Sequence, residues 1–177
     1  LYSGPGYTVR AGFQYIYSLS AFSFEISDLT INLGSLAIGT PSTDTNQLTI
    51  KAGSVSGYQV LTYEQHPLQS ENNENIPDTE CDNGLCDETS AEVWDQDTTY
   101  GFGYNIQGND IPGDFTNSTY YRQFANDEAG ETHQAVMSRN SATTEAIATV
   151  TYKANIDASQ ETGNSETAIV YIAVPQY

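Results

Sequence analysis

The chain has 177 residues, of which 23 are acidic and 5 are Lys or Arg, so its formal net charge is −18. A chain this acidic is repelled by phosphate backbones and by anionic lipid, which argues against nucleic-acid partners and against attachment to a membrane surface. No stretch approaches the roughly 20 consecutive apolar residues that cross a bilayer, so we expect no membrane insertion. The length suits a single domain. Thirteen Tyr among many Thr, Ser and Asn favour strands and turns over helices.

Residues 7–21 alternate between apolar and polar side chains, and only Gly12 and Ile16 blur the pattern. The apolar side chains fall on odd positions, at Tyr7, Val9, Ala11, Phe13, Tyr15, Tyr17 and Leu19. This period of two predicts a long strand with one buried face. From Phe22 onward the apolar residues fall on even positions, and such a change of phase flips the buried face. We therefore expect a joint that separates an N-terminal extension, residues 1–21, from a single domain, residues 22–177.

Further segments with strand alternation follow, separated by turn-forming residues, and no segment keeps a helical period beyond a turn or two near 118–127. The expected strands lie within residues 22–26, 29–33, 47–53, 58–64, 98–108, 133–138, 145–156 and 167–177. Gly101 and Gly103 alternate with Phe102 and Tyr104, so we expect another segment to approach the backbone there, or the sheet to bend. The pattern predicts an all-β fold, an antiparallel β-sandwich of the immunoglobulin-like or jelly-roll kind, with an extended N-terminal strand.

Residues 64–98 form a strongly acidic loop that contains both cysteines, Cys81 and Cys86. Their spacing matches no zinc motif, and a disulfide that braces this loop is expected. We expect Trp94 to pack onto the core beside it. A disulfide implies an oxidising compartment, and the chain begins without a signal sequence, so we expect a mature protein at the cell surface or outside the cell, with its signal peptide already removed.

The same loop carries a candidate calcium site, because hard cations bind carboxylate and carbonyl oxygens. The candidate ligands are Asp78, Glu80, Asp82, Asp87 and Glu88. The EF-hand register fails at Asn83 and Thr89, which leaves either an irregular calcium site or a solvated acidic loop. We expect no other cofactor.

Asn117 is the first residue of the only glycosylation sequon, and glycosylation would require Asn117 to face solvent.

Catalytic motifs are absent from the sequence. Only His66 and His133 could act as bases near neutral pH, and the chain lacks the serine-nucleophile, zinc-protease and phosphate-loop motifs. Acidic pairs of the glycosidase kind are available from composition alone, but the acids crowd into loops. We expect that the protein is not an enzyme.

Three segments carry a resemblance to known proteins. The final residues ATVTYKANIDASQETGNSETAIVYIAVPQY resemble the closing hairpin of secreted surface proteins from small, mostly uncultivated bacteria, and INLGSLAIGTPSTDTNQLTI and TTYGFGYNI resemble other parts of the same group. This resemblance spans most of residues 22–177 and implies a β-sandwich at the cell surface. More distantly, a strand ahead of a sandwich resembles the TasA/camelysin and archaeal bundling-pilin group, which implies polymerisation by donor-strand complementation.

Two interpretations of residues 1–21 remain open. The segment either forms the first strand of its own sandwich or inserts into an identical subunit as a donor strand. The second implies a structural subunit of an extracellular filament, a pilus-like or matrix fibre that is a head-to-tail homopolymer. The alternative function is a cell-surface adhesion or glycan-binding module that uses the aromatic side chains of its acidic face.

Overall fold

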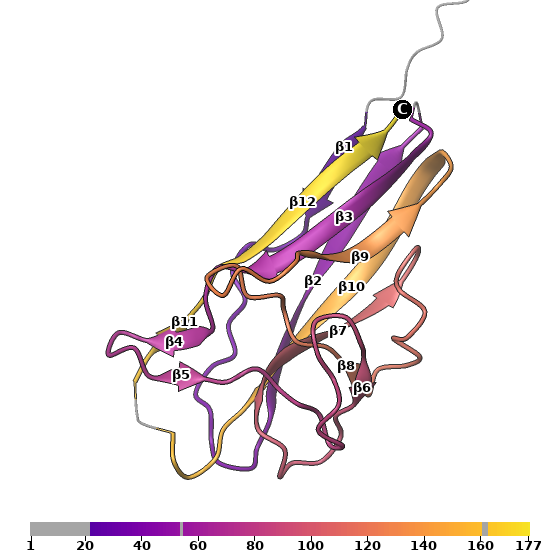
Figure 1. The fold of residues 1–177 in the computed structure, drawn as a ribbon. Helices are drawn as coiled ribbons and strands as arrows, with labels where there is room; N and C mark the ends of the chain where they lie inside the picture. Colours follow the sequence, from indigo (N-terminus) through magenta and orange to yellow (C-terminus); the bar gives the residue numbers. More distant parts are fainter. Residues whose placement is uncertain (1–21, 54, 161–162) are drawn as a thin grey trace, which may run out of the picture.

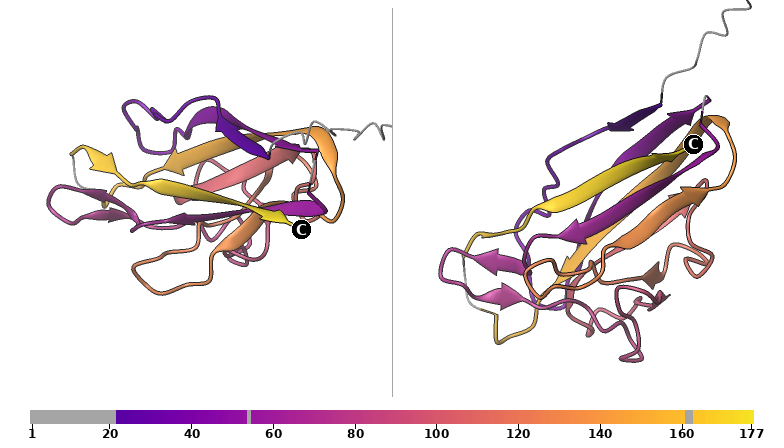
Figure 2. Two further views of the ribbon diagram at one scale, coloured as in Figure 1. Left: turned by 90° about the horizontal axis from the view of Figure 1, so that it is seen from above. Right: turned by 45° about the horizontal axis from the view of Figure 1, so that its top comes forward.

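The computed structural model describes residues 22–53, 55–160 and 163–177, so the predicted donor strand lies outside the described residues. Two antiparallel sheets face each other across a hydrophobic core (Figures 1 and 2), and no helix occurs in these three ranges. Consequently no helix there is long and apolar enough to cross a membrane. The prediction of an all-β sandwich is confirmed.

The first sheet has four strands and the second has three. In spatial order the first contains β1 (Ser23–Ile26), β2 (Ser42–Ala52), β10 (Thr143–Asn155) and β7 (Gly101–Gly108), and the second contains β12 (Ile169–Gln176), β3 (Gly57–Glu64) and β9 (Gln134–Arg139). Two small sheets join β11 (Ser165–Glu166), β4 (Leu68–Ser70) and β5 (Asn75–Ile76), and β6 (Glu92–Val93) with β8 (Tyr120–Tyr121).

The core lies between the two main sheets and is built from the alternating faces that the sequence predicted. Leu48 and Ile50 of β2, Val150 of β10 and Val60 of β3 have no exposed surface. Phe124 stacks on Tyr104 of β7 with ring centroids 4.3 Å apart. Burial of these apolar faces is the main force that holds the sheets together.

Seven of the eight expected segments contain an observed strand. In chain order these strands are β1, β2, β3, β7, β9, β10 and β12. The strand expected at 29–33 is wrong. There the backbone amides of Thr30, Asn32 and Gly34 donate to the side-chain oxygens of Asp28, Asp44 and Asn32 rather than to a neighbouring strand. Short polar side chains thus compete with ladder bonds. The helical turn considered near 118–127 is also absent, because Tyr120–Tyr121 forms β8.

Part of the acidic loop covers the outer face of the first sheet as a third layer. The amine of Lys153, which points out of β10, donates to the carbonyl of Trp94 at 2.9 Å and lies over the indole ring. The side-chain amide of Asn155 donates to the carbonyls of Asp97 and Thr99. Both faces of β10 are therefore buried at this end.

The glycines of β7 let this layer approach, as the sequence predicted. A Cβ on Gly103 would lie 2.6 Å from the carbonyl oxygen of Arg122 and 2.8 Å from Cγ2 of Thr79. A Cβ on Gly101 would lie 2.6 Å from Cα of Thr79. The backbone of β7 therefore packs directly against two other segments.

Replacing Gly103 by alanine should destabilise the fold by about 1–3 kcal/mol, because the added methyl group overlaps backbone that cannot move freely. Gly113→Ala is the matched control, since a Cβ there meets nothing within 4 Å. Urea unfolding followed by circular dichroism measures both. Equal stability of the two variants would show that the third layer yields easily at Gly103.

Candidate functional site

Strands β1 and β12 are the edge strands on the same side of the sandwich, where Figure 1 shows them close together. In the described part of the chain, β1 pairs only with β2, and β12 pairs only with β3. Each strand therefore has one edge without a ladder partner there. Such edges present rows of backbone N–H and C=O groups that another strand can bind.

The register shows which backbone groups of β12 face away from β3. The amide of Gln65 donates to the carbonyl of Ala168, so the even-numbered residues of this strand bond to β3. The peptide groups of Ile169, Tyr171 and Ala173 therefore point to the free edge. Pro175, which has no N–H, falls at a position of the same kind.

Apart from Pro175 near its end, strand β12 lacks the usual protection of an edge strand. Its eight residues, IVYIAVPQ, contain no charged side chain, although the chain carries a net charge of −18. Ile172 is 38% exposed and Val174 is 42% exposed on its outer face. Soluble proteins commonly place charges on exposed edges to prevent pairing with other chains. A long, uncharged edge strand is open to strand addition.

A groove with a volume of about 770 Å³ lies at the start of β12, beside the segment that follows β1. Ile26 of β1 and Ile169 and Tyr171 of β12 line it, and further lining comes from Ile31, Leu33, Leu36, Leu68, Ile76, Phe102 and Ile156. Tyr152 and Tyr171 share a hydrogen bond of 2.8 Å between their hydroxyl groups. The lining is mixed, since polar and acidic side chains, among them Asp28, Asn46 and Glu166, contribute about as much of it as the apolar ones.

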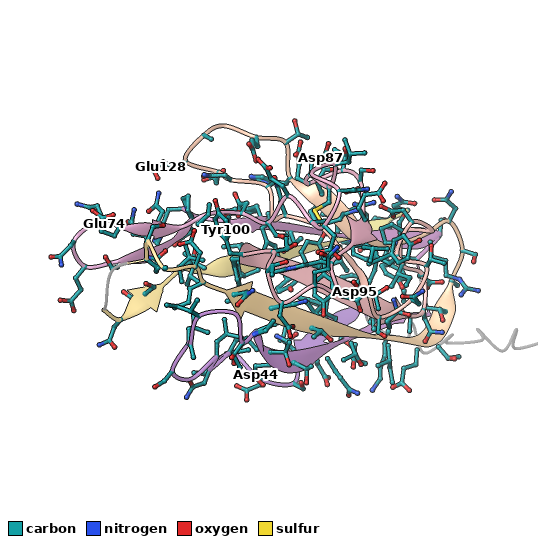
Figure 3. The ribbon with its side chains drawn as sticks, turned by 90° about the horizontal axis from the view of Figure 1, so that it is seen from below. Asp44, Glu74, Asp87, Asp95, Tyr100 and Glu128 are labelled. Atoms are coloured by element: carbon teal, nitrogen blue, oxygen red, sulfur yellow. A yellow bond between two sulfur atoms is a disulfide. The ribbon has the colours of Figure 1, made fainter. Side chains whose placement is uncertain are left out.

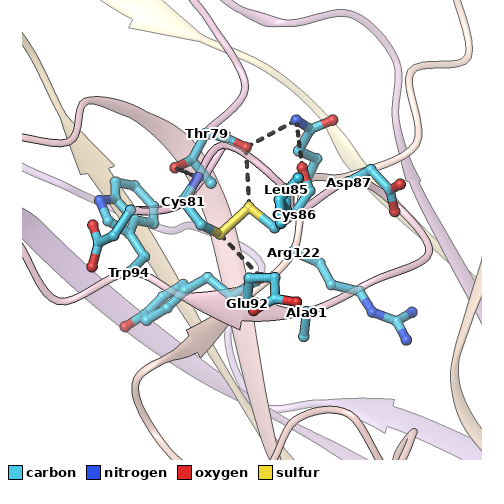
Figure 4. The surroundings of a disulfide bond; sticks show 12 residues. Thr79, Cys81, Leu85, Cys86, Asp87, Ala91, Glu92, Trp94 and Arg122 are labelled. Atoms are coloured by element: carbon cyan, nitrogen blue, oxygen red, sulfur yellow. Dashed lines mark hydrogen bonds between the residues drawn. A yellow bond between two sulfur atoms is a disulfide. The ribbon is translucent and has the colours of Figure 1, made fainter.

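The disulfide predicted between Cys81 and Cys86 is present in the acidic loop (Figure 4). Trp94 lies beside it as expected, with its indole in edge-to-face contact with the ring of Tyr121. This group forms a second apolar cluster on the outer face of the first sheet rather than part of the core between the sheets. The disulfide indicates an oxidising, extracellular environment.

The buried position of Trp94 corrects one expectation about the acidic face. Only 1% of Trp94 is exposed, so its ring is enclosed by the loop and cannot form a platform for a glycan. Tyr100, which is 47% exposed, is the large aromatic side chain that this face does present to solvent.

Two of the five predicted calcium ligands, Asp82 and Asp87, are used in other ways. Asp82 accepts hydrogen bonds from the amides of Asp95 and Gln96 and from the hydroxyl of Thr99, and Asp87 accepts from Thr89. These bonds lower the pKa of both carboxyl groups against the opposing effect of burial. Glu80 is exposed and Glu88 is partly buried.

The loop acids do not converge on one centre. Among the residues that the structure describes, no three Asp, Glu, His or Cys side chains are arranged to hold a metal ion. Acidic side chains such as Asp44, Glu74, Asp87 and Glu128 instead lie around the outline of the molecule (Figure 3). Asp78 differs from the others because its carboxyl points inward to Glu64.

The Glu64 carboxyl is the functional candidate that sequence analysis missed. Glu64 is the last residue of β3 and lies on the inner face of that strand with no exposed surface. The signal was the alternation Tyr58, Val60, Thr62, Glu64, which places an acid at an inward position. Its partner Asp78 comes from a distant segment that the pattern could not pair with it.

The two histidines are engaged separately. His133 lies 3.0 Å from Asp127 and stacks on Tyr63, whereas His66 contacts the carbonyl of Pro67.

Asn117 is exposed, which meets the requirement for glycosylation, and its side-chain oxygen accepts bonds from Thr119. Glycosylation stays a prediction.

No family model matches this chain, and no curated protein matches it. The fold and its sites therefore carry the functional argument.

Replacing both Cys81 and Cys86 by alanine should lower the free energy of unfolding by about 2 kcal/mol, because the disulfide closes only a short loop in the unfolded chain. The two main sheets should remain, since neither cysteine contributes to the core between them. Urea unfolding with near-ultraviolet circular dichroism of Trp94 measures the change. Collapse of the whole fold would mean that the third layer supports the sandwich.

Proposed function

We propose that this protein is a structural subunit of an extracellular filament, in which the N-terminal segment of one copy binds as an added strand between β1 and β12 of the next. The observation that carries the proposal is the uncharged edge of β12, which has no ladder partner among the described residues, beside a groove that Ile26, Ile169 and Tyr171 help to line. Strand addition supplies backbone hydrogen bonds along such an edge, and pockets for alternate side chains give specificity.

Residues 7–19 have the properties that this groove requires of an occupant. Seven apolar side chains fall on one face of the segment, so alternate residues would enter the groove. The segment would span about 40 Å when extended, at about 3.3 Å per residue, which exceeds the length of the eight-residue β12. One donor strand is therefore long enough to cover the whole edge.

Charge supports the same pairing. The first acidic residue of the chain is Glu25, and Arg10 is the only charged side chain before it. In a protein with 23 acidic residues, the N-terminal segment and β12 are both free of acids. Contact between these two elements avoids the repulsion that would oppose contact between most other surfaces of two copies.

Insertion into another copy is favoured over folding back. No Gly, Pro, Asn or Asp occurs between Phe13 and Ser27, so the sequence offers no turn that would reverse the chain just before β1. A donor that enters a neighbour forms a head-to-tail contact, and such contacts propagate into an open filament.

Phe13→Asp should abolish assembly, because it places a charge on the apolar face of the donor segment. Gln14→Asp is the matched control: it adds the same charge on the opposite face and should leave filaments intact. Negative-stain electron microscopy of the full-length proteins compares them. Filaments formed equally by both variants, or a monomeric wild-type protein, would contradict the proposal.

Ala173→Pro should block the acceptor instead of the donor. It removes an N–H group on the free edge of β12, while Pro175 already occupies the same kind of position without loss of the strand. Alone, this variant should stay monomeric. Mixed with the Phe13→Asp variant, it should form 1:1 dimers in size-exclusion chromatography, because each variant keeps the half that the other lacks. Failure of the mixture to dimerise would argue against β12 as the acceptor.

A further inference from the structure

The carboxyl group of Glu64 is buried inside the sandwich, where an ionised acid is costly unless another group compensates its charge. Its side chain has no exposed surface, and neither carboxyl oxygen has a hydrogen-bond partner in the described residues. One carboxyl oxygen of Asp78 is likewise buried without a donor there. Buried carboxylates are stable only when hydrogen-bonded, paired with a positive group, bound to a metal or protonated.

Three separate segments bring acids to this point. Glu64 ends β3, Asp78 follows β5, and Glu131 lies in the segment between β8 and β9. The backbone folds tightly around Glu64: its amide donates to Ala125, its carbonyl accepts from Asp127, and Glu131 accepts from the amide of Asn126. Two ionised carboxylates cannot bond to each other, but the Glu64 and Asp78 groups are close enough for one of them to donate to the other when it is protonated.

No positive group compensates for these acids. Burial raises the pKa of Glu64 most, and the negative charges of Asp78 and Glu131 raise it further. Burial and then Glu131 raise the pKa of Asp78. No Lys, Arg or His of the described residues is among the groups that act on either pKa. The site thus attracts a cation that the protein does not itself supply.

We propose that Glu64 and Asp78 bind one calcium ion, with Glu131 adding negative charge nearby. Both groups offer oxygen ligands only, which is the donor set that hard cations prefer. Calcium accepts six to eight oxygens in irregular geometry, so backbone oxygens and water can complete a shell that two acidic side chains begin. Its two positive charges balance the two carboxylates. This differs from the loop site expected at Asp78, Glu80, Asp82, Asp87 and Glu88, and only Asp78 is common to both.

The ion would join parts of the structure that border the groove. Glu64 is paired with Ile169 at the start of β12, and Asp78 is bridged to Phe102 of β7. Ile169 and Phe102 both line the groove. Calcium would therefore hold the base of the groove together without contacting an incoming strand.

Thermal unfolding of the full-length protein tests the site. Calcium at a hundredfold excess over its dissociation constant should raise the melting temperature by about 5 °C or more relative to EDTA. The same concentration of magnesium should have a smaller effect, because magnesium requires a stricter octahedral shell. The calcium shift should be larger at about pH 8 than at about pH 5, since protons compete for the carboxylates. Repeating the series with Phe13→Asp separates this effect from assembly.

Glu64→Gln should remove the calcium shift, and it should not destabilise the protein in EDTA, because it replaces an uncompensated acid by a neutral isostere. Glu80→Gln, two residues from Asp78 and exposed, is the matched control and should keep the full shift. Equilibrium dialysis should show one high-affinity calcium ion per chain in the control and none in Glu64→Gln.

Two results would overturn the proposal. An equal calcium shift in Glu64→Gln and the wild-type protein would place the effect on the acidic surface. No calcium shift at any pH, together with stability in EDTA that falls as pH rises, would show that the pair holds protons. The raised pKa values predict that sign in the absence of metal, because stability is complete below the ordinary pKa of the acids and is lost as pH rises through the raised values.

Discussion

Every backbone N–H and C=O group needs a hydrogen-bond partner, and an edge strand leaves one row of these groups available to water or to another strand. In this protein the edge strand that is least protected against another strand is β12. Among the described residues one row of its peptide groups has no ladder partner, two of its apolar side chains are exposed, and it has no charge that would keep another strand away. The groove next to it and the free edge of β1 belong to the same side of the sandwich. Together these features support our proposal that one more strand completes the sandwich.

The acidic residues are distributed unevenly along the chain. Two of its basic residues are used internally, since Arg122 binds Asp114 through two hydrogen-bonded oxygens and Lys153 lies against Trp94. The surface of residues 22–177 is therefore dominated by acids, which repel other copies. The N-terminal segment and β12 are among the elements that contain no acid, so charge opposes contact between them less than contact between acidic surfaces.

The sandwich was predictable wherever one face of a strand is buried and the other is wet. The segments of β2, β3 and β10 show that alternation, and the glycines of β7 correctly indicated a close approach. Residues 29–33 show the same alternation but form no strand, because Asp28, Asn32 and Asp44 satisfy the backbone locally. Alternation records which side chains are apolar, and it does not record which groups bind the backbone.

The sequence by itself determined the all-β class, the positions of the long strands and the disulfide, because each depends on neighbours close in the chain. Only the tertiary structure decided that β1 and β12 border one groove, that Trp94 is enclosed, and that Glu64 meets Asp78. These contacts join segments far apart in sequence, and their partners are selected by sheet order and register. Local periodicity carries no information about either.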